Sequence, residues 1–452
     1  MPQEAVLDLV RKEVEDFLAM DVGSDEGLEI LENQVRCLTR KIGESLLQHK
    51  LDVWVGKNRG GYMGQEIQTP EGVAQFERYE SRRLQSYFGR LELSRAYYWR
   101  RGGLSRSRYA PLDQKLGLDE RMATPALRRG LIMLGVELPF GRAERMLKEL
   151  TGVEVSAKTI SEATEDEGAR IREQEAARAR EAWIVFDGPS CHQAGKAHVG
   201  GGGDMKKWEG VEGPPVLYIQ MDGGRVNTEE GWREPKIGVF FRGTDIVEVS
   251  KDRREILRKE YIGTMEGIEE FMKRIWETGH RWGAHKARNL IMLGDGAEGF
   301  QKRMAELFPE AIQILDWYHA VEHLWEVGRS LVGPERAAKW VKPYSDLLRA
   351  GKVGKVLERL RRLHPRRREA AKKVAELIGY YENNRERMKY DEFERLGYFI
   401  GSGSVESGVK NVVNMRMKGC GMIWGVDRAD RMLHARATYL SQEQPGLEQL
   451  AA

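Results

Sequence analysis

The feature that most constrains this chain is residues 289–329, where two short apolar runs flank an amphipathic segment and each run ends in an aspartate. Residues 290–293 stop at Gly294-Asp295-Gly296, as a buried strand does when it presents one acidic side chain in a loop. The second run ends at Asp316, after a segment with apolar residues at helical spacing. Ligands of open α/β sheets lie beyond the carboxyl ends of the strands, so Asp295 is a candidate site residue.

The composition bounds the class of protein. A chain of 452 residues is long enough for two to four domains, and its formal net charge of only +3 does not by itself indicate a polyanionic partner. Cys37, Cys191 and Cys420 lie far apart and offer neither a disulfide framework nor a CxxC zinc pattern. The sequence shows no apolar signal core and no membrane-length apolar run. We therefore expect a cytoplasmic, nucleoid-associated protein without a membrane partner.

The first 50 residues repeat apolar side chains at steps of three and four, with a break at residues 21–26. This periodicity predicts a helical hairpin with a packing or self-association role.

Residues 81–110 form the most basic part of the N-terminal half, with eight arginines, one acid and interleaved aromatic residues. Arginine neutralises phosphate and stacks on bases, and aromatic side chains add stacking faces, so this mixture suits nucleic acid. The alternative is a solvated two-stranded ribbon whose arginines only keep it soluble. The arginines that we assign to DNA binding are Arg82, Arg83, Arg90, Arg95, Arg100 and Arg101.

From residue 124 the pattern is helical, with a turn at Thr151-Gly152 and Ser156 as the N-cap of a third helix. This outline predicts a helix-turn-helix with Lys158 and Thr159 on the leading turn of the recognition helix. Several acids follow at once and would repel phosphates, so a plain helical bundle is the alternative.

Two predicted strands each end in Asp-Gly: residues 183–186 before Asp187, and residues 216–221 before Asp222. Asp222 is followed by two more predicted strands, a helix and the strand that ends at Asp295, which gives a β-β-β-α-β order. Asp187 instead precedes the glycine tract 200–203, which is typical of a flexible connection. This context favours Asp222 over Asp187 as a site residue.

A third acid follows a charged helical region that includes RLRRLHPRRR around the helix-breaking Pro365. A Gly-Ser-Gly-Ser loop at residue 401 leads into a helix whose first turn carries Glu406, where the helix dipole alone would favour an acid. Asp222, Asp295 and Glu406, if brought together, would suit Mg²⁺ or Mn²⁺. Two such ions about 4 Å apart stabilise both oxygens of a phosphodiester exchange. With 70 acids in the chain, spacing alone is weak support for this triad.

The segments LGDGAEGFQKRMAELFPEAIQILDWYHAVEHLWEVGRSL and GSGSVESGVKNVVNMRMKGCGMIW resemble the insertion-sequence transposases of the Kra type, bacterial relatives of the Mutator-like DDE group. The resemblance also takes in MDGGRV, GWREPKIGVFFR and upstream segments, and covers most of the chain after about residue 81. It implies an RNase H-like catalytic core, an α-helical insertion between the second and third acids, and cleavage or strand transfer at the element's own DNA ends.

Position by position, the resemblance makes Asp222, Asp295 and Glu406 the three catalytic, metal-binding acids. One departure concerns a Cys-x-x-Cys knuckle that many relatives carry, since this chain has residues 99–103, WRRGG, in its place. Thiolates therefore cannot bind zinc there, and we expect a basic ribbon without metal.

Asp316 and His319 resemble the acid-x-x-His motif of the Mutator-like group. Helical spacing would place Asp316, His319 and His323 on one face, so a zinc site is a competing interpretation. The plainer interpretation is that the histidines pair with core carboxylates or with DNA phosphate.

We expect an α/β protein with an RNase H-like mixed-sheet core and an all-α insertion, preceded by helical and helix-turn-helix-like regions. The expected divisions are a helical hairpin at 1–50, a basic aromatic ribbon at 81–122, a helix-turn-helix-like domain at 123–180, the first part of the core at 181–330, the insertion at 331–400, and a C-terminal helical part of the core at 401–452.

The expected function is that of a DNA transposase that forms a homo-oligomer and acts with Mg²⁺ or Mn²⁺. Its partners would be double-stranded DNA, both the terminal inverted repeats of the element and the target. One alternative is a catalytically inactive, transposase-derived DNA-binding protein. Another is a structure-specific nuclease with the same core.

Overall fold

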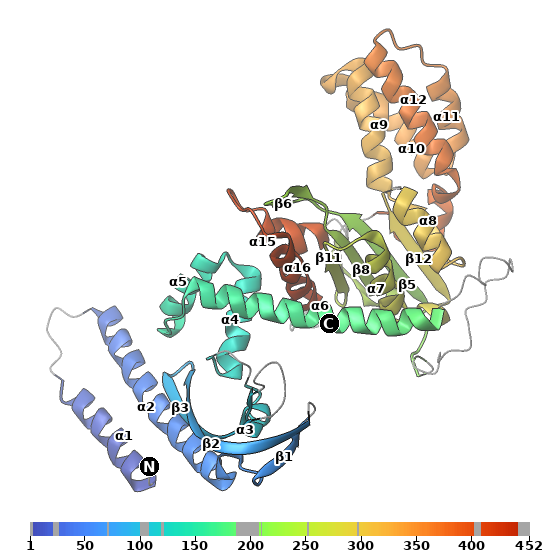
Figure 1. Cartoon of the computed structure of the whole chain (residues 1–452). Helices are drawn as coiled ribbons and strands as arrows, with labels where there is room; N and C mark the ends of the chain where they lie inside the picture. The colour runs from blue at the N-terminus through green and yellow to red at the C-terminus, as the bar shows by residue number, and fades with distance from the viewer. Residues whose placement is uncertain are drawn as a thin grey trace. The chain divides into compact units, whose positions relative to one another are not determined.

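The computed structural model divides the chain into two compact units, Met1–Thr164 and Glu165–Ala452 (Figure 1). The helix α6 (Ala157–Phe186) runs across the boundary between them. The structure describes residues 3–20, 27–69, 72–99, 108–118, 122–186, 208, 210–250, 253–295, 298–401 and 408–441. Among these residues, no helix combines the length and the apolar character that a membrane crossing requires.

The first unit begins with two helices, α1 (Gln3–Leu18) and α2 (Leu28–Lys57), which pack on each other and confirm the predicted helical hairpin. Many apolar side chains of this hairpin are exposed, including Leu18 and Leu28, and none of the 30 residues of α2 is buried. The C-terminal end of α2 packs instead on a neighbouring core, where Leu51, Trp54 and Val55 are partly buried against Leu84, Leu91, Leu93 and Leu112.

A four-stranded antiparallel sheet follows, in the order β1-β2-β3-β4. Its strands are β1 (Glu66–Thr69), β2 (Gly72–Gln85), β3 (Arg90–Trp99) and β4 (Arg108–Tyr109). The paired β2 and β3 confirm the ribbon predicted from residue 81, but β2 begins at Gly72, before the composition becomes basic. One face of the ribbon is apolar, with Leu84, Leu91 and Leu93 packed on Leu112.

The first unit ends in helices α3 (Pro111–Lys115), α4 (Pro125–Glu137) and α5 (Phe140–Thr151) and the start of α6. Gly152 ends α5 with φ 68°, a left-handed conformation that glycine adopts without steric cost. The Ser156 hydroxyl accepts a hydrogen bond of 3.2 Å from the Thr159 N–H, as predicted for the N-cap of α6.

One secondary-structure prediction was wrong. Residues 183–186 were expected to form a strand, but they are the last residues of α6. The preceding run EQEAARAREA consists largely of strong helix formers, and Ala179 and Ala182 are buried three residues apart, so the helix continues through the short apolar run. Asp187 lies outside the described residues.

The second unit is built on a mixed five-stranded sheet in the order β11-β8-β5-β12-β13. Its strands are β5 (Val216–Gly223), β8 (Lys236–Arg242), β11 (Glu260–Thr264), β12 (Asn289–Gly294) and β13 (Ile312–Leu315). β5, β8 and β11 pair antiparallel, as the predicted meander required, and β12 is parallel to both β5 and β13. The predicted mixed α/β class is confirmed.

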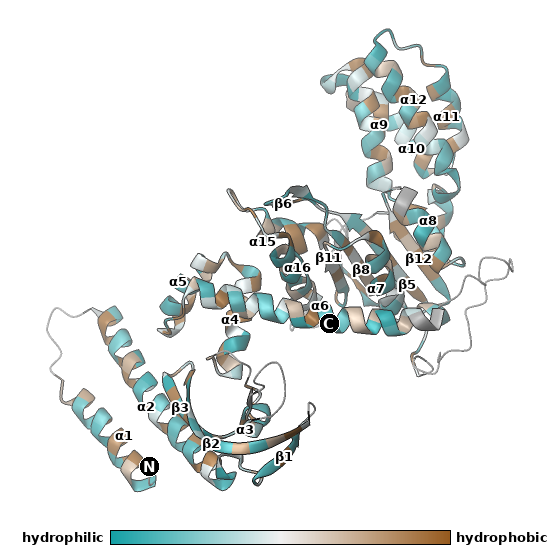
Figure 2. Cartoon of the chain, in the orientation of Figure 1, coloured by the Kyte–Doolittle hydropathy of each residue, from teal (hydrophilic) through white to brown (hydrophobic). Residues whose placement is uncertain are grey.

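The two faces of the sheet pack against different parts of the chain. Leu217, Ile219 and Met221 pack in a core with α7 (Ile268–Arg281) and α8 (Glu298–Leu307). Alternate residues of a strand point to opposite faces, so Tyr218, Gln220 and Asp222 point away from that core. Figure 2 colours the apolar residues of this five-stranded sheet brown.

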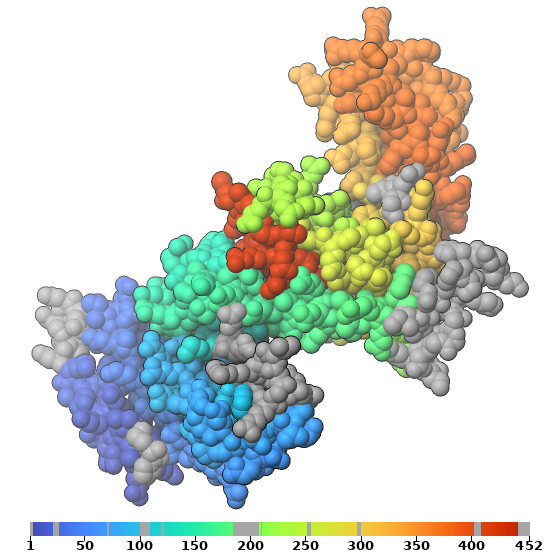
Figure 3. Space-filling view, in the orientation of Figure 1, coloured from blue at the N-terminus to red at the C-terminus, as the bar shows by residue number. Residues whose placement is uncertain are grey.

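Two hairpins extend from the sheet. One is β6 (Val226–Thr228) with β7 (Gly231–Arg233), and the other is β9 (Ile246–Ser250) with β10 (Arg253–Ile256). The β6–β7 hairpin lies beside the segment around Trp424, to which Thr228 forms a parallel bridge (Figure 3).

A helical part follows β13 in sequence, and Figure 1 shows it projecting from the sheet. It comprises α9 (Trp317–Val332), α10 (Pro334–Arg349), α11 (Val353–Arg361), α12 (Arg368–Asn383) and α13 (Tyr390–Arg395). Pro365 lies between α11 and α12, as its helix-breaking character predicted. The chain then returns to the sheet through the π-helix η7 (Val409–Asn414), α15 (Met415–Met417) and α16 (Val426–Ser441).

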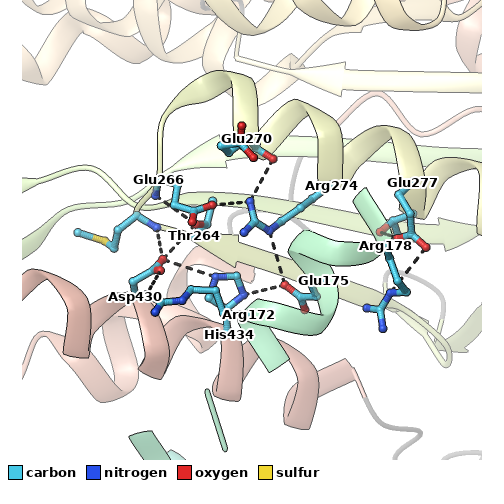
Figure 4. Close-up of polar contacts among 12 residues, drawn as sticks. Arg172, Glu175, Arg178, Thr264, Glu266, Glu270, Arg274, Glu277, Asp430 and His434 are labelled. Atoms are coloured by element: carbon cyan, nitrogen blue, oxygen red, sulfur yellow. Dashed lines mark hydrogen bonds and ion pairs between the residues drawn. The ribbon is translucent and has the colours of Figure 1, made fainter. Parts of the chain in front are cut away.

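A buried polar network joins α16 to α6, β11 and α7 (Figure 4). The fully buried His434 ring lies 2.7 Å from Glu175 and 3.6 Å from Asp430. Asp430 accepts hydrogen bonds from the Met265 N–H and from the Arg172 guanidinium. This network ties the C-terminal helix to the edge strand β11 and so fixes where the chain returns to the sheet.

Candidate active site

Asp222 is the next-to-last residue of β5, the central strand of the sheet. Its side chain is half-buried, and its Oδ1 accepts a hydrogen bond of 2.7 Å from the Gly223 N–H. It lies on the face of the sheet opposite the core beneath α7. Asp222 is thus presented at a strand end, as the sequence predicted.

Asp295 directly follows β12, which is the parallel neighbour of β5. Leu293 pairs with Gln220, so two residues further along each strand Asp295 and Asp222 reach the same level at the carboxyl ends. Leu290 and Met292 point into the core, so Asp295, three residues beyond Met292, shares the outer face with Asp222. The structure therefore brings these two acids together although 295 − 222 = 73 residues separate them.

Asp316 extends this arrangement to β13, because Gly294 pairs with Leu315 and the Asp316 N–H donates to the Gly294 carbonyl at 2.9 Å. We call Asp222, Asp295 and Asp316 the carboxyl-end row. Unlike the other two, Asp316 is fully buried. It is the N-cap of α9, where its Oδ1 accepts from the His319 N–H at 2.7 Å and contacts the His319 ring at 3.1 Å.

His323 does not complete a metal site with these residues. Its side chain is exposed, and its ring lies 4.5 Å from the ring of Tyr380 on α12. Within the described part of the chain, no group of three His, Cys, Asp or Glu side chains has a metal-binding arrangement. The structure shows Asp316 and His319 engaged with each other at a helix start.

Two residues that the sequence did not single out interact with Asp295, one through a hydrogen bond and one through its charge. The Tyr380 hydroxyl donates to the Asp295 carbonyl at 2.6 Å, and burial together with the Asp295 carboxylate raises the pKa of Tyr380. Arg387, after α12, is also near Asp295, and burial lowers the pKa of its guanidinium. A tyrosine and an arginine in a helical region carry no local pattern that marks them, so only the fold identifies them.

Glu406 lies outside the described residues, which resume at Gly408. Gly408 packs closely on β8 and β11, where an added Cβ would be 3.1 Å from Val239 and 3.0 Å from Tyr261. Both Val239 and Tyr261 lie outside the core beneath α7, so this segment covers the face of the sheet that carries Asp222. Gly224, two residues after Asp222, also lies close to this segment, since an added Cβ at Gly224 would be 3.4 Å from Val409.

Neither a protein-family model nor a curated protein matches this chain.

The predicted DNA-binding arginines of the ribbon divide into two groups. Arg82 and Arg95 are mostly buried and form ion pairs with Asp113 at 2.9 and 3.1 Å. Arg83 and Arg90 are exposed, and Arg83 is 3.5 Å from the equally exposed Glu92. Arg100 and Arg101 lie outside the described residues.

At the start of α6, the side chain of Lys158 is 85% exposed and lies 3.9 Å from Glu162. The Thr159 hydroxyl is 3.0 Å from that of Ser156 and belongs to the helix cap. The cationic group available on this turn is therefore Lys158.

Proposed function

We propose that this chain is a DDE-type DNA transposase that cleaves and transfers DNA strands at a site formed by Asp222, Asp295 and Glu406. The observation that carries the proposal is the geometry of the first two acids. They lie at one level, on one face, at the carboxyl ends of two adjacent central strands. Ligands of open α/β sheets bind at that edge.

The topology supports an RNase H-like core. Three antiparallel strands, a helix and a parallel strand follow one another as β5, β8, β11, α7 and β12, with β12 beside β5. This is the β-β-β-α-β order expected from the sequence, interrupted only by two hairpins. The helical part between β13 and η7 stands where the transposase resemblance implies an insertion.

Glu406 is proposed as the third acid on the basis of the segment that follows it. Gly408, two residues later, packs on the sheet face that carries Asp222. This packing and the resemblance of residues 401–424 to the transposase segment support the assignment of Glu406.

The residues fit hard divalent cations, because carboxylate oxygens are the ligands that Mg²⁺ and Mn²⁺ prefer. When bound, such ions would stabilise the charge on the attacking and leaving oxygens of a phosphodiester exchange. The carboxylates would hold and orient the ions, and the charge of Arg387, which interacts with Asp295, would offset part of the mutual repulsion of the acids. Water and then a terminal 3′-hydroxyl would attack in line, without a covalent protein intermediate.

Double-stranded DNA would be bound through exposed cations of the first unit. Arg83 and Arg90 on the ribbon and Lys158 on α6 are accessible to phosphate. Such contacts release counterions, so DNA affinity should fall steeply as salt increases.

The test uses end-labelled duplexes taken from the inverted repeats that flank the gene, with nicked and joined products resolved on denaturing gels. Asp222→Asn, Asp295→Asn and Glu406→Gln should each lower cleavage by about 1,000-fold or more while DNA binding persists. Asp346→Asn, an exposed acid on α10, is the matched control and should cleave like the wild type.

Three results would contradict the proposal. Nicking retained by Asp295→Asn would show that this acid is not catalytic. Cleavage without any joining, across Mg²⁺ and Mn²⁺, would indicate a nuclease. Tight DNA binding by the wild type without cleavage would indicate a DNA-binding protein that has lost the activity.

A further inference from the structure

The β6–β7 hairpin leaves the sheet directly after Asp222. Gly224 and Arg225 connect β5 to the hairpin, and the Gly224 N–H donates to the Pro235 carbonyl at 2.8 Å, which closes the base of the hairpin. Asp222 itself pairs with Ile237 on β8. Both arms of the hairpin are therefore anchored at the residue that we place in the active site.

A second segment holds the hairpin in place. The Trp424 N–H donates to the Asn227 carbonyl at 3.1 Å, and the Glu229 N–H donates to the Trp424 carbonyl at 3.0 Å. The Trp424 side chain is buried, its Nε1–H donates to the Met417 carbonyl at 3.1 Å, and the Arg416 guanidinium covers its ring at 5.4 Å. These hydrogen bonds and the buried Trp424 side chain fix the position of the hairpin.

The hairpin has one buried face and one open face. Val226 and Thr228 are 0% and 3% exposed, whereas Trp232, which pairs with Asn227, is 66% exposed. Single exposed apolar residues are ordinary on protein surfaces. A large indole is a different case when a fixed hairpin presents it ten residues after a site acid, as it does here.

The hairpin around Trp232 carries exposed charges of both signs. Arg225 and Arg233 are exposed, and so are Glu229, Glu230 and Glu234, with Glu230 paired to Arg233. Exposed aromatic faces bind unpaired nucleotides, because the ring stacks on a base of any sequence.

We propose that Trp232 stacks on an unpaired base of the DNA strand that enters the site of Asp222 and Asp295. This rests on the proposed function and specifies its substrate as a DNA end with at least one unpaired base beside the cleaved bond. The base could come from a pre-existing single-stranded overhang or from a base turned out of the duplex, at the cost of its stacking.

The experiment measures binding without cleavage, in EDTA, so that its outcome is independent of catalysis. Fluorescein-labelled oligonucleotides, either single-stranded or duplex with an overhang, are titrated against the full chain by anisotropy. Trp232→Ala should weaken binding by about 5-fold to 100-fold, the range expected for one lost base stack, and Trp232→Phe should keep most of the affinity. Val249→Ala, an exposed apolar residue on the β9–β10 hairpin, is the matched control and should bind like the wild type.

A second measurement identifies the source of the base. 2-Aminopurine is placed in turn at each position of an overhang and of a blunt duplex end, because its fluorescence reports unstacking from its neighbours. A change that depends on Trp232 only in the overhang supports a pre-existing single strand, and a change inside the blunt duplex supports base extrusion.

The proposal is overturned if Trp232→Ala binds every oligonucleotide like the wild type while circular dichroism shows an intact fold. It is also overturned if the loss is equal for all duplexes and no 2-aminopurine position responds to Trp232. Failure of the transposase proposal has a different signature, since cleavage would then be absent with or without Trp232 while stacking persists in EDTA.

Discussion

At the scale of single residues, the three aspartates of the carboxyl-end row are alike in sequence and different in environment. Each comes directly after a run of apolar strand residues, yet Asp222 and Asp295 are half-buried and Asp316 is fully buried. The Asp316 carboxylate accepts from the His319 backbone at the start of α9, where the helix dipole also favours a negative charge. Its position therefore indicates a structural role.

We expect Asp316→Ala to lower the free energy of unfolding by about 1 to 2 kcal/mol, because α9 loses its cap. Asp316→Asn keeps a side-chain oxygen that can accept from His319 and should cost less. Urea denaturation followed by circular dichroism measures both. An Asp316→Asn protein of unchanged stability but without strand cleavage would instead place Asp316 among the catalytic residues.

His434 is the second residue whose environment sets its behaviour. Burial alone would lower the pKa of this imidazole, but the carboxylates of Asp430 and Glu175 raise it to about 9. Arg172 and Arg274 complete the charges around these carboxylates. The folded protein therefore holds a proton on His434 more tightly than the unfolded chain does.

Because the pKa of His434 is raised in the folded protein, the direction of the pH dependence of stability follows. The contribution of His434 to stability is complete below its unfolded pKa of about 6.5 and is lost as pH rises through about 9. We expect stability to fall on the order of 3 kcal/mol from this group between pH 6 and 10. Denaturant titrations of the wild type and His434→Gln across that range should show a much shallower pH dependence in the variant. Parallel curves would contradict the assignment.

At the scale of elements, strand β2 shows how alternation sorts adjacent arginines. Arg82 points toward Asp113 and is 12% exposed at its side chain, whereas Arg83, on the other face, is 74% exposed. The arginines of the ribbon therefore have two different roles. Arg82 forms an internal ion pair, and Arg83 is an accessible cation.

Arg82 and Arg83 provide a matched pair for DNA binding. Arg83→Ala should weaken DNA binding and lower the slope of log affinity against log salt by about 1, with little change in thermal stability. Arg82→Ala should lower the melting temperature, because it leaves Asp113 with one ion-pair partner fewer in a mostly buried place. The reverse pattern in anisotropy and calorimetry would show that Arg82 contacts DNA.

At the scale of the whole molecule, the proposed site depends on folding that joins distant parts of the chain. Asp222 and Asp295 come from strands that are neighbours only in the sheet, and Tyr380 donates to the Asp295 carbonyl from the helical part. A cation held by these acids would bind the folded chain far more tightly than the unfolded one.

Mn²⁺ should therefore stabilise the folded chain. At a concentration 100 times its dissociation constant, one bound ion adds about 2.7 kcal/mol to the free energy of unfolding. We expect differential scanning fluorimetry to show a rise in melting temperature with Mn²⁺ that Asp222→Asn and Asp295→Asn abolish. Without cations, the same variants should be as stable as the wild type or more stable, because like charges are removed. A rise that persists in both variants would place the ion elsewhere.

Local patterns predicted much of the fold. The strands before Asp222 and Asp295, the helix between them and the Ser156 cap all followed from periodicity and capping, because these depend on neighbouring residues. The strand expected at residues 183–186 failed because a short apolar run is equally compatible with the end of a long helix.

The sequence by itself determined that the strands at 216–221 and 290–293 lead into Asp222 and Asp295 and that the arginines of residues 82–95 lie on a ribbon, since alternation and turn chemistry are local properties. Only the tertiary structure decided that Asp222 and Asp295 share one level and one face, that Asp316 is buried as a helix cap, and that Arg82 pairs with Asp113. Strand register and burial depend on contacts between residues far apart in the chain, and those contacts form only when the whole sheet assembles.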